Sequence, residues 1–167
     1  MAKYLKQENG SIKEEAAINT STGAGDAGKI PALGSGGRLD ISMMPAGMGA
    51  DTASVVASEN LSAGDLVNIY DDSGTSKCRK ADATTAGKEA VGFVLTVVNA
   101  AENATVYFEG CNDQLTSLTA GVQFLSTTAG GVTSTAPSAS GNIVQRVGYA
   151  VNATTINVEF SQPIELA

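Results

Sequence analysis

The sequence predicts a mainly β protein: an extended N-terminal arm over residues 1–52, followed by a small β-barrel or β-sandwich over residues 53–167. Beyond Thr52, short apolar runs alternate with turn residues, which is the pattern of successive strands. Small residues dominate the composition, and charged residues make up only 16%, against a usual share of about a quarter. Because aromatic residues are 5% and Trp is absent, the core has to be built from Val, Ile, Leu and Ala.

The first fifty residues show little regular patterning. In the segment SIKEEAAI (11–18), Ser11 and Glu14 have the spacing of a helix capping box. Alternate residues of the same segment would also line one face of an extended strand. A short helix and an extended segment both remain open there. From Ala24 to Gly49 no regular element is predicted, and a structureless stretch of this length is rare inside a compact domain. We therefore interpret it as part of an arm.

The rest of the chain contains a series of strand patterns. DLVNIYDD (65–72) and TSKCRKAD (75–82) meet at the turn sequence DDSG (71–74), which predicts a β-hairpin. EAVGFVLTVV (89–98) is almost continuously apolar, so we expect a strand buried on both faces, with Gly92 marking a bulge. Further strands are expected at residues 53–58, 104–110, 121–127, 130–135, 142–151 and 155–160.

The charge balance limits the expected partners. The net charge is -7 and the pI is about 4.4, and such a surface repels both the phosphate backbone of nucleic acids and anionic membranes. Neither nucleic acid nor a membrane is therefore an expected partner. The longest mostly apolar run, residues 90–98, is too short to span a bilayer. The first ten residues lack the apolar core of a signal peptide, so we expect a soluble protein that does not follow the standard secretion route.

One glycine-rich segment comes close to a nucleotide-binding motif. In GAGDAGKIP (23–31), Gly23, Gly28 and Lys29 keep the spacing of a phosphate-binding loop. Ile30, however, stands where the motif requires a magnesium-binding hydroxyl, and Pro31 disfavours helical geometry just where a helix should begin. No buried strand is predicted before the segment. The sequence therefore predicts a loop that binds no nucleotide, and no cofactor is expected.

No other residues form a recognisable catalytic or metal-binding group. The chain has no His, which is the commonest general base and metal ligand. Asp71 and Asp72 are explained by the predicted hairpin turn, where Asp bonds to the local backbone. Cys78 and Cys111 belong to no CxxC pair, and we interpret them as reduced structural thiols, with a disulfide between them left open. We expect no enzyme activity, no catalytic residue, no metal and no small-molecule substrate.

Three segments resemble proteins of tailed bacteriophages. GDAGKIPALGSGGRLDISMMP (25–45) is similar to segments of phage virion proteins, which in tail fibres precede a folded module. LSAGDLVNIYDDSGTSKCRKADATTAGKEAVGFV (61–94) resembles the β-module of capsid decoration, or cement, proteins. QRVGYAVNATTINVEFSQPIELA (145–167) resembles the closing strands of that module. These motifs are turn and strand patterns rather than catalytic residues.

The resemblance implies a structural virion protein with a β-tulip-like domain. Such a protein would be made in the host cytoplasm, bind the outside of the phage head as a homotrimer, and bridge subunits of the major capsid protein. A Gly-rich arm can wedge between such subunits or add a strand to them. The expected capsid-binding residues of the arm are Ile30, Leu33, Arg38, Leu39, Ile41, Met43 and Met44. The alternative is a tail-fibre or tailspike-associated adaptor for host attachment, because tail-fibre proteins share the GRLD (37–40) type of segment.

Overall fold

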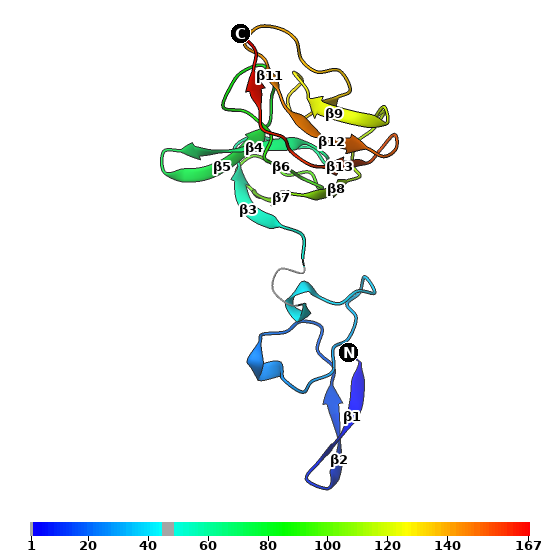
Figure 1. Cartoon of the computed structure of the whole chain (residues 1–167). Helices are drawn as coiled ribbons and strands as arrows, with labels where there is room; N and C mark the ends of the chain where they lie inside the picture. The colour runs from blue at the N-terminus through cyan, green and yellow to red at the C-terminus, as the bar shows by residue number, and fades with distance from the viewer. Residues whose placement is uncertain (1, 45–48) are drawn as a thin grey trace. The chain divides into compact units, whose positions relative to one another are not determined.

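The computed structural model describes residues 2–44 and 49–167 (Figure 1). Within these residues the regular structure consists of β-strands and two short 3₁₀ helices, so the predicted mainly β class is confirmed. Contacts divide the chain into two compact units, Met1–Gly49 and Ala50–Ala167, which we call the N-terminal unit and the β unit. The described residues include no helix that is long and apolar enough to cross a membrane.

The N-terminal unit begins with a β-hairpin. Strands β1 (Lys3–Glu8) and β2 (Ser11–Ala16) pair antiparallel, and Glu8 lies opposite Ser11. The two residues between them, Asn9 and Gly10, have φ angles of 52° and 79°. Positive φ at both central positions is typical of the type I′ turn, which Asn-Gly favours and whose twist matches that of the two strands. Of the two alternatives for residues 11–18, the extended one is therefore correct for residues 11–16.

Loops follow the hairpin and pack against its open end. They contain two 3₁₀ helices, η1 (Ala24–Asp26) and η2 (Ile41–Met43). Ile18 forms a parallel bridge with Pro31, and the buried Ala17 donates its N–H to the carbonyl of Ala2. The structure does not confirm a simple extended arm in this part of the chain, because the hairpin and these bonds fold the N-terminal unit back on itself.

The first half of the β unit is a closed five-stranded barrel, as predicted. Its strands follow the order β3-β5-β4-β6-β7 around the barrel. Their bounds are β3 (Thr52–Ala57), β4 (Leu66–Asp72), β5 (Thr75–Lys80), β6 (Gly92–Phe93) and β7 (Asn103–Tyr107). The small residues Ala57, Cys78 and Ala104 pack inside it with Val67, Val94 and Val106. A core of aliphatic side chains, expected from the composition, is what the structure contains.

The second half of the β unit adds a five-stranded sheet and a separate strand pair. The sheet has the order β10-β9-β12-β13-β8, and β11 pairs with β14. The bounds are β8 (Gly110–Asn112), β9 (Gly121–Leu125), β10 (Val132–Thr133), β11 (Ile143–Val144), β12 (Arg146–Ala150), β13 (Ile156–Val158) and β14 (Ile164–Glu165). Leu66 and Phe93 of the barrel share one core with Leu125, Val147 and Ile156 of the sheet, so the two halves form one folded body.

The apolar segment 89–98 differs from the prediction. Only Gly92 and Phe93 form a strand, and Val97 is 72% exposed. The chain turns after Val94 so that Val98 can bridge to Leu61. A Cβ on Gly92 would lie 2.4 Å from Cγ1 of Val106, and the structure records no register shift there. This glycine therefore permits close packing of β6 against β7 and does not mark a bulge.

Candidate binding surface of the N-terminal unit

The two units differ sharply in charge. Residues 1–49 contain five basic and five acidic residues, so the N-terminal unit is neutral. The remaining residues contain five basic and twelve acidic side chains, which carry the whole net charge of -7. A neutral surface can approach a partner of either sign without electrostatic repulsion. The acidic β unit is the part of the chain that repels polyanions.

Exposed apolar side chains are concentrated in the neutral unit. Among the described residues, thirteen large apolar side chains are exposed, and seven of them lie between residues 2 and 44. These seven are Leu5, Ile12, Ile30, Leu33, Leu39, Ile41 and Met44. The N-terminal unit is less than a third of the chain, so this density is unusual. Contiguous exposed apolar surface in a soluble protein often marks an interaction site.

The structure places the seven predicted capsid-binding residues on loops that follow the hairpin. Five of them are exposed apolar side chains: Ile30, Leu33, Leu39, Ile41 and Met44, with exposed fractions between 39% and 64%. Arg38 is also exposed, at the end of the glycine-rich turn. Met43 is half-buried and lines a small depression with Ile18 and Pro31. Six of the seven are thus accessible to a partner.

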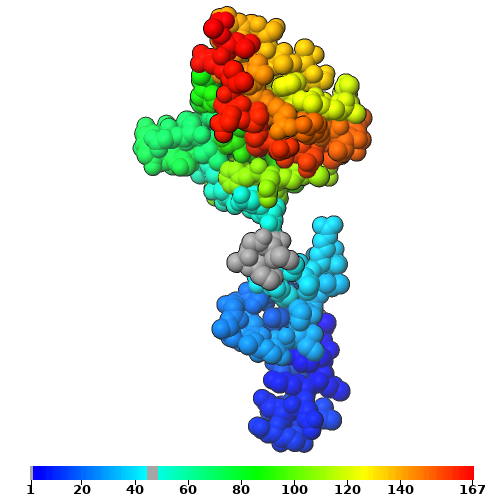
Figure 2. All heavy atoms as spheres, in the orientation of Figure 1, coloured from blue at the N-terminus to red at the C-terminus, as the bar shows by residue number. Residues whose placement is uncertain are grey.

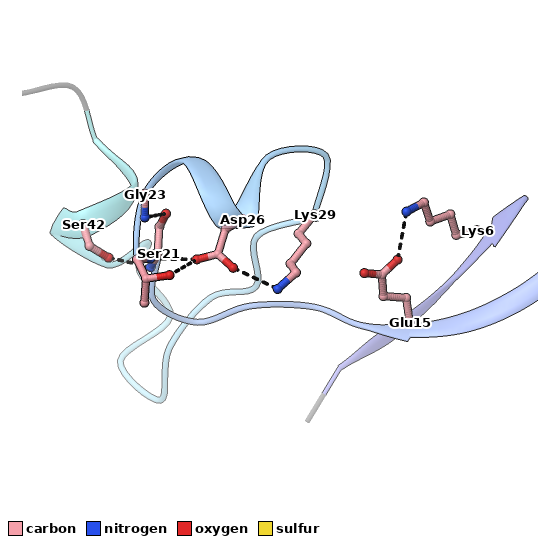
Figure 3. Close-up of polar contacts among 8 residues, drawn as sticks. Lys6, Glu15, Ser21, Gly23, Asp26, Lys29 and Ser42 are labelled. Atoms are coloured by element: carbon pink, nitrogen blue, oxygen red, sulfur yellow. Dashed lines mark hydrogen bonds and ion pairs between the residues drawn. The ribbon is translucent and has the colours of Figure 1, made fainter. Parts of the chain in front are cut away.

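The glycine-rich loop that resembles a nucleotide-binding motif is closed by its own carboxylate (Figure 3). Asp26 accepts hydrogen bonds from the backbone N–H of Thr22 at 2.7 Å and from its hydroxyl at 2.9 Å. Lys29 donates to the same carboxylate at 2.9 Å. In a phosphate-binding loop, the lysine and the backbone N–H groups face the phosphate. Here the lysine and the Thr22 N–H are already satisfied by Asp26, and η1 is only three residues long.

A short series of polar contacts ties this loop to η2 (Figure 3). Gly23 donates its N–H to the Ser21 hydroxyl, and Ser21 donates its own N–H to the Ser42 hydroxyl at 2.8 Å. The Ser42 hydroxyl donates in turn to Asp40 at 2.6 Å, and the hydrogen bonds from Ser42 lower the pKa of Asp40. These bonds hold the loops that carry the exposed apolar side chains in one arrangement. A surface held in this way loses less conformational entropy when it binds.

The carboxylate of Asp26 should titrate well below the ordinary range for aspartate. The hydrogen bond from Lys29 and those from Thr22 lower its pKa from 3.8 to about 2. Because the folded pKa is depressed, Asp26 stabilises the loop above pH 4, and this contribution is lost as the pH falls toward 2. We expect carbon-detected NMR of the side-chain carboxyl to give a midpoint near 2, and the Lys29→Met variant to move it upward. A midpoint near 3.8 in the wild-type chain would contradict the closed loop.

The two aspartates of the predicted hairpin turn and the basic residues that follow them have structural roles. Asp71 accepts a hydrogen bond from the N–H of Gly74 in the turn, and Asp72 pairs with Lys77 at 2.6 Å, which raises the pKa of Lys77. Arg79 stacks over the ring of Tyr70, 4.3 Å from its centre. Lys77 and Arg79 are therefore engaged within the β4–β5 hairpin, which the DDSG turn predicted correctly.

The cysteines are not paired with each other. Cys78 is buried in the barrel, where burial raises the pKa of its thiol, and Cys111 is exposed on β8. The disulfide alternative is therefore wrong for this structure. Across residues 2–44 and 49–167, no group of three or more Asp, Glu or Cys side chains is arranged to hold a metal ion.

Sequence reasoning missed two exposed residues of the hairpin, Leu5 and Ile12. Their side chains are 72% and 74% exposed and lie on the same face of β1 and β2. The signal was present in the sequence, because Asn9-Gly10 is a strong hairpin turn between two segments of strand length. No family model matches the chain, and the comparisons with curated proteins and with solved structures likewise give no match.

Proposed function

We propose that this protein is a structural component of a tailed-phage virion, which decorates the outside of the capsid and bridges neighbouring subunits of the major capsid protein. The proposal starts from the resemblance of residues 25–45, 61–94 and 145–167 to phage virion and decoration proteins. The observation that carries it is the concentration of exposed apolar side chains in a neutral N-terminal unit, in a chain whose β unit is acidic. The capsid surface is the environment in which those side chains would be buried.

The proposed contact surface consists of the loop residues Ile30, Leu33, Arg38, Leu39, Ile41, Met43 and Met44. Ile30, Leu33 and Ile41 are each at least half exposed, so burying each one against a partner would contribute about 1 kcal/mol. Glycines at positions 34, 36 and 37 lie between them and allow a partner's backbone to approach closely. A homotrimer, which the resemblance implies, would present three such surfaces, and weak single contacts would then add up through avidity.

The proposal is tested by replacing three apolar loop residues together. We expect the variant Ile30→Ser/Leu33→Ser/Ile41→Ser to bind decoration-free shells of the phage that encodes this chain about 100-fold more weakly than wild type, since about 3 kcal/mol of apolar burial is removed. Co-sedimentation of protein with purified shells measures the binding. Heating the pelleted shells then measures whether the protein stabilises them.

The matched control replaces three side chains of similar exposure in the β unit. Val97, Val151 and Ile164 are 72%, 62% and 62% exposed, and the triple Ser variant should bind within about threefold of wild type. If the control loses as much binding as the loop variant, the contact surface is not in the N-terminal unit. If neither the wild type nor the variants bind shells, the decoration function itself is wrong.

One observation favours the second candidate function, a tail-fibre or tailspike-associated adaptor. A depression of about 490 Å³ in the β unit is lined without any charged side chain. Its polar lining consists of Gln114, Thr116, Ser117, Thr119, Gln123, Thr133 and Ser134. Hydroxyl and amide groups of this kind suit a neutral sugar of a host receptor. Immunogold labelling of particles separates the two functions, because a decoration protein covers the head and an adaptor labels the tail.

A further inference from the structure

The outer edge of strand β1 in the N-terminal hairpin is unpaired among the described residues. Within residues 2–44 and 49–167, β1 pairs only with β2, and the turn end of the hairpin projects beyond the loops of its own unit (Figure 2). A two-stranded hairpin is at best marginally stable alone in water. Leu5 and Ile12 are the most exposed large apolar side chains among residues 2–44, and with Lys6 and Gln7 they line a depression of about 270 Å³.

The hydrogen-bond pattern between β1 and β2 determines which backbone N–H and C=O groups of β1 point outward. Ala17 donates its N–H to the carbonyl of Ala2, and Glu8 and Ser11 close a two-residue turn. In an antiparallel pair, hydrogen-bonded positions alternate with positions whose N–H and C=O point away from the partner strand. Even-numbered residues of β1 therefore face β2, while Lys3, Leu5 and Gln7 direct their backbone groups to the outer edge.

We infer that the outer edge of β1 pairs antiparallel with the same edge of a second copy of this chain, with Leu5 opposite Leu5 on the two-fold axis. This register places Lys3 opposite Gln7 and Tyr4 opposite Lys6 of the second copy. No like charges lie directly opposite each other, and Lys6 comes beside an aromatic ring that attracts cations. The result is a four-stranded sheet, β2-β1-β1-β2, with Leu5 and Ile12 of both copies on one face.

Other pairings of the hairpin are less favourable. Moving the axis by one residue to Lys6 would place two lysines directly opposite each other. On the β2 edge, axes at Lys13, Glu14 or Glu15 would each oppose identical charges, and like charges opposite one another destabilise a sheet. Charged side chains on an edge strand are a common protection against pairing. The centre of β2 is protected in this way, whereas the centre of β1 carries an exposed leucine. An axis at Ile12 would oppose no like charges, but it lies one residue from the turn end of β2 and would pair only residues 11–13 of each copy.

This inference goes beyond the proposed function, because it concerns contacts between copies of the chain and not contacts with a shell. It also does not depend on how the β units associate. Two copies joined through β1 would be linked by about six new backbone hydrogen bonds and by the cross-strand contact between two leucine side chains. On any surface that the protein covers, such a contact would connect neighbouring copies to one another.

Cysteine cross-linking of the full chain tests the register. In a Cys111→Ser background, Leu5→Cys should form a disulfide-linked dimer under mild oxidation, because the Cα atoms of a hydrogen-bonded antiparallel pair lie about 5.5 Å apart, a separation that a disulfide can span. Ile12→Cys is equally exposed, but its two copies would be separated by at least three strand spacings, about 14 Å. We expect at least tenfold more dimer from Leu5→Cys on a denaturing non-reducing gel. Equal dimer from both variants, or none from either, would overturn the inference.

A pair of proline variants tests the edge without relying on a disulfide. The N–H groups of Leu5 and Glu14 both point away from the hairpin ladder, so proline at either position removes no bond between β1 and β2. Leu5→Pro should weaken hairpin-mediated association at least tenfold in sedimentation equilibrium, while Glu14→Pro should stay within twofold of wild type. If both variants weaken association, or if neither does, pairing through the β1 edge is wrong.

Discussion

Replacing Val94 with Asp should destabilise the β unit by more than about 4 kcal/mol and lower its melting temperature by about 15 °C or more. Val94 is 1% exposed and packs in the barrel core with Val67, Val98 and Val106. A carboxylate there loses its hydration and finds no partner of opposite charge in this apolar cluster. Calorimetry of the full chain measures the effect, because each unit can give its own transition.

The matched control is Val97→Asp, three residues further along the chain. Val97 is 72% exposed, so its replacement should change the free energy of unfolding by no more than about 0.5 kcal/mol. The effect at Val94 should also shrink as the pH is lowered toward 4, because the protonated side chain costs less to bury. Equal effects at the two positions would mean that Val94 does not point into the barrel.

The sequence indicates where the strands of the β unit lie more clearly than it indicates how long each strand is. Turn chemistry located the β4–β5 hairpin, since Ser73 and Gly74 adopt the positive φ angles that the DDSG turn requires. Hydrophobicity did not give the length of β6, because an apolar run can bury its residues in a turn as well as in a strand. Phe93 and Val94 are buried while Val91 and Val97 are exposed. The path of the chain around the barrel decides which residues of the apolar run are buried.

The N-terminal unit shows what can be predicted about the candidate site. The apolar residues of the loops were identifiable because glycine and proline surround them and leave no regular element in which to bury them. The way in which the loops are held was not predictable, since it depends on Asp26 and Ser42 bonding to residues that periodicity does not connect. The hairpin could have been predicted from Asn9-Gly10, but the alternation of its charged residues hides the strand pattern.

The second large effect is expected at Gly148, which sits in β12 next to a shift in the register with β9. Its φ is 147°, a conformation that L-residues rarely adopt, and a Cβ there would lie 2.1 Å from the carbonyl oxygen of Asn157. β12 is the central strand of its sheet, so it cannot move away from β13 without breaking its ladder with β9. Backbone strain and overpacking together should make Gly148→Ala less stable by about 3–5 kcal/mol.

Gly74→Ala separates the two causes of that destabilisation. Gly74 also has a positive φ, 87°, but a Cβ there would meet no atom within 4 Å, so only the backbone strain of about 1–2 kcal/mol remains. Urea unfolding of both variants, followed by far-ultraviolet circular dichroism, gives the two free energies. We expect Gly148→Ala to be the more destabilised by at least about 2 kcal/mol, because the carbonyl of Asn157 belongs to the β13 backbone and cannot rotate away as a side chain could. Equal losses would mean that β13 yields to the added methyl group, and that the tight packing of β12 against β13 does not stabilise the sheet.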